Sequence, residues 1–461
     1  MITKMRVAGF KAWKDTGEFR LAPITVFFGK NSSGKTSLLQ FLLMLKQTAE
    51  SADRHQTFQT RVSGTPIDLG SWTDIVHRHE QDAQLEFRLE WTLPKDVSAK
   101  DPDGGTSLTG NGCGFEASVG LVNGAGRPQV GAMQYDLLYD SRKLLSVGMQ
   151  RSSSTQKRGY ELWATGYDLR RRVGRPFSTP PGPLRFYGFP EEASAKYQNA
   201  GFALDLVLAL EQQLRRVHCL GPLRAHPERE YRWSAEAPPD VGWEGESAVA
   251  ALLAAAGRKL NHPRKPRRPF QEHIASWLSD VGLLHSFQTH RVAADQDLYL
   301  VRVQLTNGSP EVSLPDVGFG VSQVLPVAVQ ALYCEPHSTV ILEQPEIHLH
   351  PTVQAGLADL FVGAIGMRED SADRSVQFII ESHSPHFLYR VQRRVAEEIL
   401  DPANVAIYYC EMTADGARLR PIPVDLFGNI TEWPEGFFDA QVDDIVETAK
   451  AGLRRKREAR E

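Results

Sequence analysis

The sequence is poor in cysteine and has no long hydrophobic run. Its four cysteines, Cys113, Cys219, Cys334 and Cys410, stand far apart in 461 residues without a C-x-x-C pair, which argues against zinc and against a disulfide framework. No stretch approaches the ~18 apolar residues of a membrane span, and the first residues lack the apolar core of a signal peptide. We therefore expect a protein of a reducing compartment, located in the cytoplasm and without a membrane partner.

An excess of positive charge is also missing. Lys and Arg number 52 against 56 Asp and Glu, which gives a formal net charge of -4. Without a global basic field, any contact with nucleic acid has to be local. The basic segments 263–269 and 453–460 are candidates for contact with DNA or RNA, and the simpler interpretation of both is a solvated loop or tail.

The strongest motif directly follows the apolar run 24–28. It reads G-K-N-S-S-G-K-T and continues into a helix-like segment, the context that a phosphate-binding loop requires. Its glycines let backbone N–H groups approach phosphate oxygens, while Lys35 would bridge the β- and γ-phosphates and Thr36 would offer its hydroxyl to Mg²⁺. The motif predicts binding of a nucleoside triphosphate. The predicted ligands are Gly29, Lys30, Asn31, Ser32, Ser33, Gly34, Lys35, Thr36 and Ser37.

Two apolar runs in the second half of the chain end in polar residues. The strand-like run 338–342 leads into E-Q-P-E, and the run 376–380 leads into E-S-H-S. Upstream of both, a glycine-containing turn opens an apolar helix whose N-terminus suits a further phosphate contact. The candidate residues of this turn are Gly318, Gly320 and Ser322.

Together these motifs resemble those of the ABC-type ATPases, specifically the prokaryotic AAA-named branch related to the SMC-like repair ATPases and the OLD family. The resemblance covers about residues 1–75 and 200–425, and the segment 427–439 looks like the end of a subgroup with an uncharacterised C-terminal domain. Many relatives of that kind lie in antiphage defence loci. The resemblance implies an α/β P-loop NTPase fold of ABC type, with a mixed sheet flanked by helices.

The spacing of hydrophobic residues divides the rest of the chain into a strand-like part and a helical part. Short alternating runs between 80 and 166 predict antiparallel strands, and helical periodicity follows between 193 and 285. With the resemblance, we predict five units. They are an N-terminal part of the ATPase core with the phosphate loop (1–79), a β-rich insertion (80–192), a helical lobe (193–285), a C-terminal part of the core (286–425) and a C-terminal extension (426–461).

The resemblance also implies chemical roles for the second half. Glu343 stands in place of the usual Walker B aspartate and, with Thr36, would hold Mg²⁺. Gln344 stands where the general-base glutamate is expected, and it can orient a water but cannot accept its proton near neutral pH. Glu346 is a second candidate base, and His383 occupies the place of the switch histidine that contacts the γ-phosphate. We therefore expect slow hydrolysis of ATP.

A site of this type is divided between two chains. The turn with Gly318, Gly320 and Ser322 of one copy would cap the γ-phosphate bound by another, so that ATP holds a homodimer or higher homo-oligomer together. Because the chain shows no nuclease constellation, a separate effector protein, a nuclease or toxin, is the expected partner. The alternatives are an ATP-locked assembly scaffold with negligible turnover, an SMC-like clamp in DNA repair, and the nucleotide-binding subunit of a membrane transporter.

Three further features leave alternatives open. The segment 68–74 is either the loop that senses Mg²⁺ in ABC proteins or a turn with a surface tryptophan. Arg224 and Arg229 either meet phosphate or pair with acids. His348 and His350 either form a metal pair on one side of an extended segment, for which a third ligand in register is lacking, or line the dimer-facing loop after Walker B.

Overall fold

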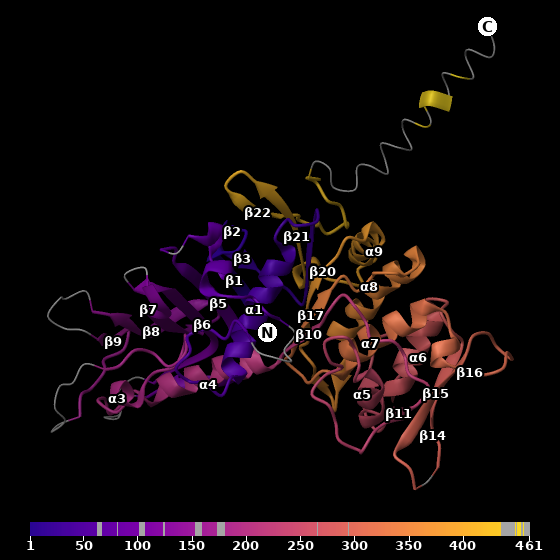
Figure 1. Cartoon of the computed structure of the whole chain (residues 1–461), viewed down its shortest axis with the longest axis horizontal. Coiled ribbons are helices and arrows are strands. Elements are labelled where there is room, and N and C mark those ends of the chain that lie inside the picture. Colours follow the sequence, from indigo (N-terminus) through magenta and orange to yellow (C-terminus); the bar gives the residue numbers. More distant parts are fainter. Residues whose placement is uncertain are drawn as a thin grey trace.

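The computed structural model describes residues 1–61, 67–80, 82–100, 107–122, 125–152, 159–172, 180–264, 266–293 and 295–434, with 448, 450–452 and 455. Four β-sheets form within these residues, two of them large (Figure 1). Most of the basic tail 453–460, and Lys265 of the basic segment 263–269, lie outside the described residues.

The larger sheet of the described chain has eight antiparallel strands in the order β2-β1-β5-β6-β7-β8-β9, with β3 beside β1. Strands β1, β2 and β3 come from the N-terminus of the chain. Strand β5 pairs directly with β1, and Val7 lies opposite Phe87. The strands are β1 (Ile2–Phe10), β2 (Trp13–Asp15), β3 (Phe19–Arg20), β5 (Leu85–Ala99), β6 (Leu108–Val122), β7 (Ala125–Tyr139), β8 (Arg142–Arg151) and β9 (Tyr160–Thr165).

The central sheet has six strands within the described residues, in the order β10-β17-β20-β4-β21-β22. The strands from β10 to β21 are parallel, and only β22 runs antiparallel to its neighbour. Because parallel strands are covered by helices on both faces, they read as short apolar runs in the sequence. The strands are β4 (Ile24–Gly29), β10 (Val217–Leu220), β17 (Thr339–Glu343), β20 (Gln377–Glu381), β21 (Val405–Thr413) and β22 (Gly416–Pro421).

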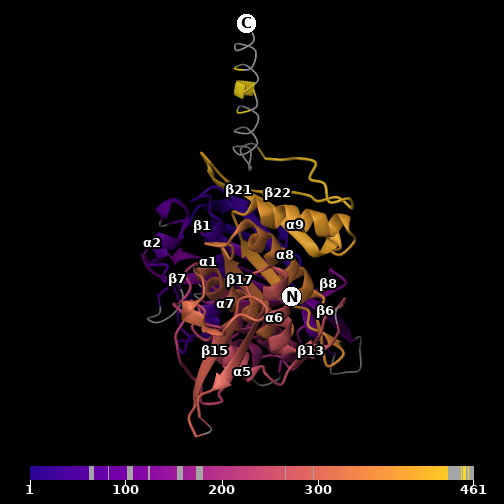
Figure 2. The same ribbon diagram turned by 90° about the vertical axis from the view of Figure 1, so that its right-hand side faces the viewer.

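Helices cover both faces of the central sheet (Figure 1). One face carries α1 (Lys35–Glu50) and α4 (Gly201–Arg215). The other carries α5 (Ala248–Ala254), α6 (Phe270–Asp280), α7 (Phe319–Tyr333), α8 (Pro351–Ile365) and α9 (Pro385–Ala396). From the side, α8 and α9 lie next to each other below β21 and β22 (Figure 2).

The remaining elements are short. Two smaller sheets have four strands each within the described residues. One contains β11 (Tyr231–Arg232), β14 (Ser286–Arg291), β15 (Leu298–Gln304) and β16 (Val312–Ser313). The other contains β12 (Lys259–Asn261), β13 (Arg268–Pro269), β18 (Arg368–Glu369) and β19 (Ala372–Asp373). Single turns of helix form α2 (Trp72–Ile75), α3 (Glu191–Ser194), η1 (His77–His79), η2 (Leu314–Asp316) and η3 (Pro402–Asn404).

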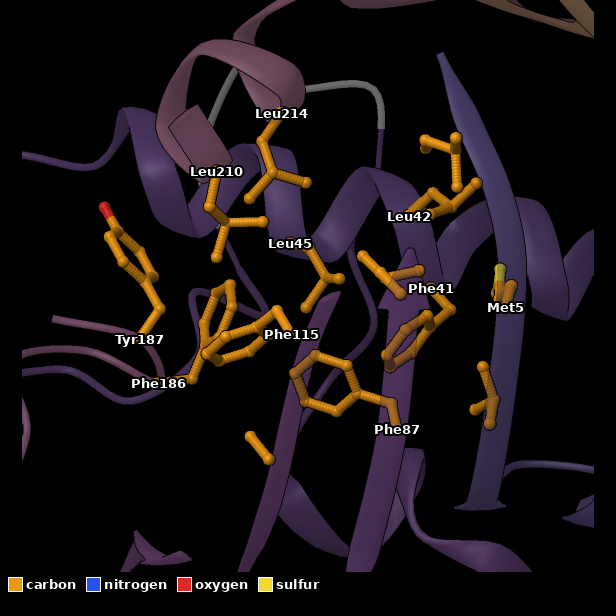
Figure 3. Packing of buried hydrophobic residues seen from close by; sticks show 14 of the residues in the cluster. Met5, Phe41, Leu42, Leu45, Phe87, Phe115, Phe186, Tyr187, Leu210 and Leu214 are labelled. Carbon is orange, nitrogen blue, oxygen red and sulfur yellow. The ribbon is translucent and has the colours of Figure 1, made fainter. Parts of the chain in front are cut away.

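The central sheet separates two hydrophobic cores because successive strand residues point to opposite faces. In β17, Ile341 packs with α1 and α4, whereas Val340 and Leu342 pack with the helices of the other face. The first core continues onto the eight-stranded sheet (Figure 3). There Phe41 of α1 meets Phe87 of β5 edge to face, with ring centroids 5.1 Å apart. The antiparallel sheet is thus fixed to the helix that follows the phosphate loop.

The structure places the predicted segments as follows. The strands expected in 80–192 do not form a sheet of their own, because they extend the sheet begun by β1. The segment 193–285, predicted as a helical lobe, contains α4, α5 and α6 but also β10, an edge strand of the central sheet. A buried strand of four residues is too short for periodicity to distinguish it from a helix. The division into five units stays a prediction.

Two findings concern the absences noted in the sequence. All four cysteines are buried and unbridged. In the described ranges, no helix is both long and apolar enough to cross a membrane.

A buried carboxylate organises one face of the eight-stranded sheet. Asp136 of β7 is fully buried and accepts hydrogen bonds from Ser146 Oγ at 2.7 Å, Gln134 Nε2 at 2.7 Å and Arg88 Nη2 at 2.8 Å. Lys143 Nζ lies 3.1 Å from the same carboxylate. Burial raises the pKa of Asp136, but these donors outweigh burial and hold the pKa below its usual value. The charge is therefore stabilised in the folded state.

Candidate nucleotide-binding site

A polar cleft of about 680 Å³ lies at the carboxyl ends of β4, β17 and β20. The ends of neighbouring parallel strands meet at one edge of a sheet, so loops that are distant in the sequence converge there. The cleft is lined by Ala12, Asn31, Ser32, Ser33, Gly34, Lys35, Thr36, Ser37, Gln344, Glu346, Ile347, His348, Gln354, Glu381, His383 and Ser384.

The phosphate loop forms the floor of this cleft and ends where α1 begins at Lys35. Two glycines in the left-handed region shape it, Gly29 at φ 147° and Gly34 at φ 93°. A Cβ atom on Gly29 would lie 2.2 Å from the carbonyl oxygen of Cys410 in the neighbouring strand, so the loop requires glycine there. Of the predicted loop ligands, residues 31–37 line the cleft. Gly29 and Lys30 instead accept hydrogen bonds from Lys35 Nζ, at 3.1 and 2.8 Å.

Glu381 is a cleft residue that our interpretation of the sequence did not assign. It ends β20, is buried, and accepts a 2.7 Å hydrogen bond from the Thr36 hydroxyl. Its other oxygen lies 3.8 Å from Lys35 Nζ. Burial lowers the pKa of Lys35, and the charge of Glu381 acts in the opposite direction. The only sequence signal was an acidic residue ending an apolar run just before His383.

The carboxylates of Glu343 and Glu346, in the predicted Walker B segment, are both buried, and burial raises the pKa of each. Glu343 lies opposite Glu381 in the parallel pair of β17 and β20. Burial, with the charge of Glu381, raises the pKa of Glu343 to about 7. Glu346 lines the cleft, and its Oε1 accepts hydrogen bonds from Ser382 Oγ at 2.9 Å and from the backbone N of His383 at 2.6 Å. One oxygen of Glu346 is therefore fixed in place.

Gln344 and His383 also line the cleft. Gln344 adopts φ 43°, and its backbone N donates to the carbonyl oxygen of Glu381 at 2.9 Å. Burial and the nearby Lys35 cation lower the pKa of His383 to about 4. Its imidazole is therefore neutral at pH 7 and carries one N–H donor.

The donor set of the cleft fits a phosphate and a hard cation. Four buried side-chain atoms of the candidate site residues make no hydrogen bond within the described structure. Ser33 Oγ, Glu346 Oε2 and His383 Nε2 belong to residues that line the cleft, whereas Glu343 Oε1 belongs to a buried residue that does not. Hydroxyl and carboxylate oxygens suit Mg²⁺, which usually keeps several waters and takes few protein ligands. No group of three or more His, Cys, Asp or Glu side chains that could hold a metal was found in the described ranges.

The second predicted phosphate contact lies outside the cleft of its own chain. Gly318 is exposed at the start of α7, and neither it nor Gly320 nor Ser322 lines the cleft. Ser322 is buried and its hydroxyl donates to the carbonyl oxygen of Phe319 at 2.8 Å. The half-exposed ring of Phe319 contacts the ring of His348 at 5.4 Å between centroids. The turn therefore adjoins the loop after Walker B, on the surface.

The alternatives left open by the sequence have different outcomes. His350 caps α8 by accepting from Thr352 N, and His348 contacts Phe319, so the two histidines have separate contacts. Arg229 pairs with Asp316 through two hydrogen bonds of 2.7 and 2.9 Å. The segment 68–74 forms a turn closed by a Ser71–Asp74 capping box and does not line the cleft. The segment is therefore a turn, but Trp72 is half-buried and packs against the first core instead of lying on the surface, and a role in sensing Mg²⁺ stays a prediction.

Comparison with known families agrees with this geometry. Residues 1–96 match a family described as "AAA ATPase domain", and residues 208–388 match one described as "AAA domain, putative AbiEii toxin, Type IV TA system". Two separate segments of the chain thus match AAA-type ATPase domains. The predicted family and the predicted P-loop fold class are confirmed. P-loop ATPases bind ATP, typically with Mg²⁺. In this ATPase, residues 400–447 match a family described as "Protein of unknown function (DUF3696)", the expected uncharacterised C-terminal domain.

Solved structures similar to this ATPase include SMC head domains. An SMC head bound to the C-terminal winged-helix domain of ScpA is 12% identical, with a TM-score of 0.46, and the match covers 92% of this chain and 98% of that one. The SMC head domain of Thermotoga maritima is 9% identical, with a TM-score of 0.38 and coverage of 91% and 98%. An SMC head from Pyrococcus furiosus is 10% identical, with a TM-score of 0.40 and coverage of 97% and 99%. No curated protein matched the sequence.

Proposed function

We propose that this ATPase binds ATP and Mg²⁺ in the cleft, hydrolyses ATP slowly, and forms a head-to-head homodimer around the nucleotide. The observation that carries the proposal is the separation of the two phosphate-binding elements. The phosphate loop lies inside the cleft, whereas Gly318 and the N-terminus of α7 are exposed outside it. A helix N-terminus on the surface can reach a phosphate bound to a second copy.

The candidate site residues have the following roles in this proposal. Lys35 would neutralise phosphate charge, and Thr36 and Glu381 of the cleft, with the buried Glu343, would hold the hydrated Mg²⁺, which would stabilise the charge that develops on the phosphate oxygens. The neutral His383 donates a hydrogen bond toward the γ-phosphate. Glu346 is the proposed general base, because burial raises its pKa and its Oε2 is unpartnered among the described residues.

We further propose that the nucleotide state of the dimer controls a separate effector or a nucleic-acid transaction in antiphage defence. Support comes from the description of the matched family as an AbiEii-type toxin of a toxin–antitoxin system. The basic segment offers a local surface for nucleic acid, although Arg267 lies 3.8 Å from Asp370 and Arg264 donates to the backbone of Glu398.

One observation favours the scaffold alternative. Gln344 occupies the position next to the Walker B carboxylate and lines the cleft, and an amide does not accept a proton at neutral pH. If Glu346 is not the base, ATP stays bound and the dimer acts as an ATP-locked scaffold. Single-turnover hydrolysis separates the two functions, since a scaffold keeps its ATP.

Complementation between two defective variants tests the shared site. Lys35→Ala removes the phosphate-loop cation, and Gly318→Glu puts a negative charge beside the partner's phosphate. A Cβ atom at Gly318 meets no other atom within 4 Å, so this variant should fold. Each variant alone should fail to dimerise on ATP in light scattering. An equal mixture should recover up to about half of wild-type hydrolysis, because only mixed dimers assemble and each mixed dimer has one of its two sites intact.

Two controls accompany this experiment. Lys14→Ala changes an exposed lysine outside the cleft and should leave ATP binding and assembly unchanged. Gly318→Ser adds a small, uncharged hydroxymethyl group at the turn, where a Cβ atom meets no other atom within 4 Å, and should keep assembly. Assembly of Lys35→Ala on ATP, or no recovery in the mixture, would count against the shared site.

A further inference from the structure

Arg224 is a buried arginine close to the Walker B strand. It lies in the loop 221–229, which follows β10, and only 9% of its surface is exposed. Its Nε and Nη1 atoms have no hydrogen-bond partner in the described structure. Burying a charge without hydrogen bonds costs several kcal/mol, roughly, so such an arrangement calls for an explanation.

Glu343 is the neighbouring group of opposite charge. Leu220 at the end of β10 pairs with Leu342 of β17, so the loop 221–229 and Glu343 leave the sheet at the same edge. Glu343 is 6% exposed, and its Oε1 atom is another buried atom without a hydrogen bond in the described ranges. The two charges influence each other, because burial lowers the pKa of Arg224 to about 10 while Glu343 counteracts this effect. A buried donor and a buried acceptor without partners in the described residues therefore lie in segments that leave the sheet at the same edge.

We propose that Arg224 is a positioning residue that orients the Glu343 carboxylate for Mg²⁺. With Mg²⁺ and nucleotide bound, the guanidinium would pair with Oε1 of Glu343, to which it makes no hydrogen bond in this structure, and would leave Oε2 to accept from the metal or its water. This inference rests on the proposed ATPase function. It gives a physical reason for the arginine, because glutamate has one more rotatable bond than the usual aspartate and needs a second contact to hold its carboxylate.

Arg229, in the same loop, is an arginine whose contacts are purely structural, and it can be compared with Arg224. Its guanidinium forms both hydrogen bonds with Asp316 on the surface, where an ion pair contributes little to stability. Arg224 differs because it is buried, has two atoms without partners and lies beside the Walker B carboxylate. Of the two alternatives left open for these arginines, pairing with an acid is the one used for both. Arg229 pairs with an acid, and Arg224 is the one assigned to the site.

Substitution of Arg224 by methionine tests this role, because the two possible roles predict opposite effects on stability. Methionine has a similar shape without the unsatisfied charge. If Arg224 positions Glu343, Arg224→Met should leave the nucleotide-free melting temperature unchanged or raise it. Affinity for ATP in EDTA should stay unchanged, whereas the gain in affinity from Mg²⁺ should fall by about 10- to 100-fold, the usual loss when a group supporting a metal ligand is removed.

Two further variants complete the experiment. Arg224→Lys keeps the charge and should restore part of the Mg²⁺ dependence. Arg232→Met, at an exposed arginine in β11, should match wild type. A lower melting temperature for Arg224→Met with normal Mg²⁺ dependence would show a purely structural arginine and overturn the proposal. If Arg224→Met lowers both the melting temperature and the gain in ATP affinity from Mg²⁺, failure of Arg224→Lys to restore that gain overturns the proposal as well. Failure of the wild type to bind ATP would instead refute the proposed function.

Discussion

Conversion of Glu346 to glutamine separates the chemical step from ATP binding. The structure predicts that the substitution is tolerated, because the glutamine oxygen can keep the hydrogen bonds from Ser382 and the His383 backbone. Its amide nitrogen then takes the place of Oε2, which has no partner in the described structure. An unpaired buried amide costs about 1–3 kcal/mol, and the loss of a buried charge offsets much of this cost.

The expected loss of activity is much larger than the change in stability. Removing a general base lowers the rate by about 10²- to 10⁴-fold, which corresponds to about 3–5 kcal/mol of transition-state free energy. Affinity for ATP should stay within about threefold of wild type, since the phosphate loop is unchanged. The ATP-held dimer should therefore accumulate.

Single-turnover hydrolysis and calorimetric ATP binding measure these two effects. Glu335→Gln, at an exposed glutamate outside the cleft, is the matched control and should behave as wild type. Hydrolysis by Glu346→Gln at the wild-type rate would refute the assignment of Glu346 as the base. Equal loss of ATP binding and hydrolysis would show that Glu346 shapes the cleft instead.

Three other substitutions test separate parts of the structure. Gln344→Glu should speed single-turnover hydrolysis by about tenfold or more if this position faces the attacking water, and an unchanged rate would leave Glu346 as the only base. Gly29→Ala should lower the melting temperature and abolish ATP binding, since its Cβ would lie 2.2 Å from the Cys410 carbonyl oxygen, whereas Gly201→Ala, with open space around its Cβ, should be neutral. Asp136→Asn should destabilise the protein at pH 7. Because the folded-state pKa of Asp136 is lowered, its stabilisation is present above its unfolded pKa of about 3.9 and is lost as the pH falls through the lower folded-state value. Denaturant unfolding should thus show the difference from wild type shrinking below about pH 4, and a constant difference would contradict this account.

Local motifs in the sequence were sufficient to predict the type of fold. The phosphate loop, the two apolar runs that end in polar residues and the order of these elements are contiguous patterns, so the chain alone carried them. Residues 31–37, Gln344, Glu346 and His383 were selected from such patterns, and all of them line the cleft. Their chemical roles stay predictions, as do the roles of Gly318, Gly320 and Ser322.

The sequence alone thus predicted three strands of the central sheet, at 24–28, 338–342 and 376–380, and the loop expected to bind phosphate, because a glycine loop between a strand and a helix is a local signal. Only the tertiary structure decided which side chains meet. Glu381 reaches Thr36 because β20 lies beside β4, although the two residues are 345 positions apart in the chain. The loop that carries Arg224 and the residue Glu343 leave the central sheet at the same edge because β10 pairs with β17. Strand order is set by packing over the whole sheet, and no local pattern of residues encodes it.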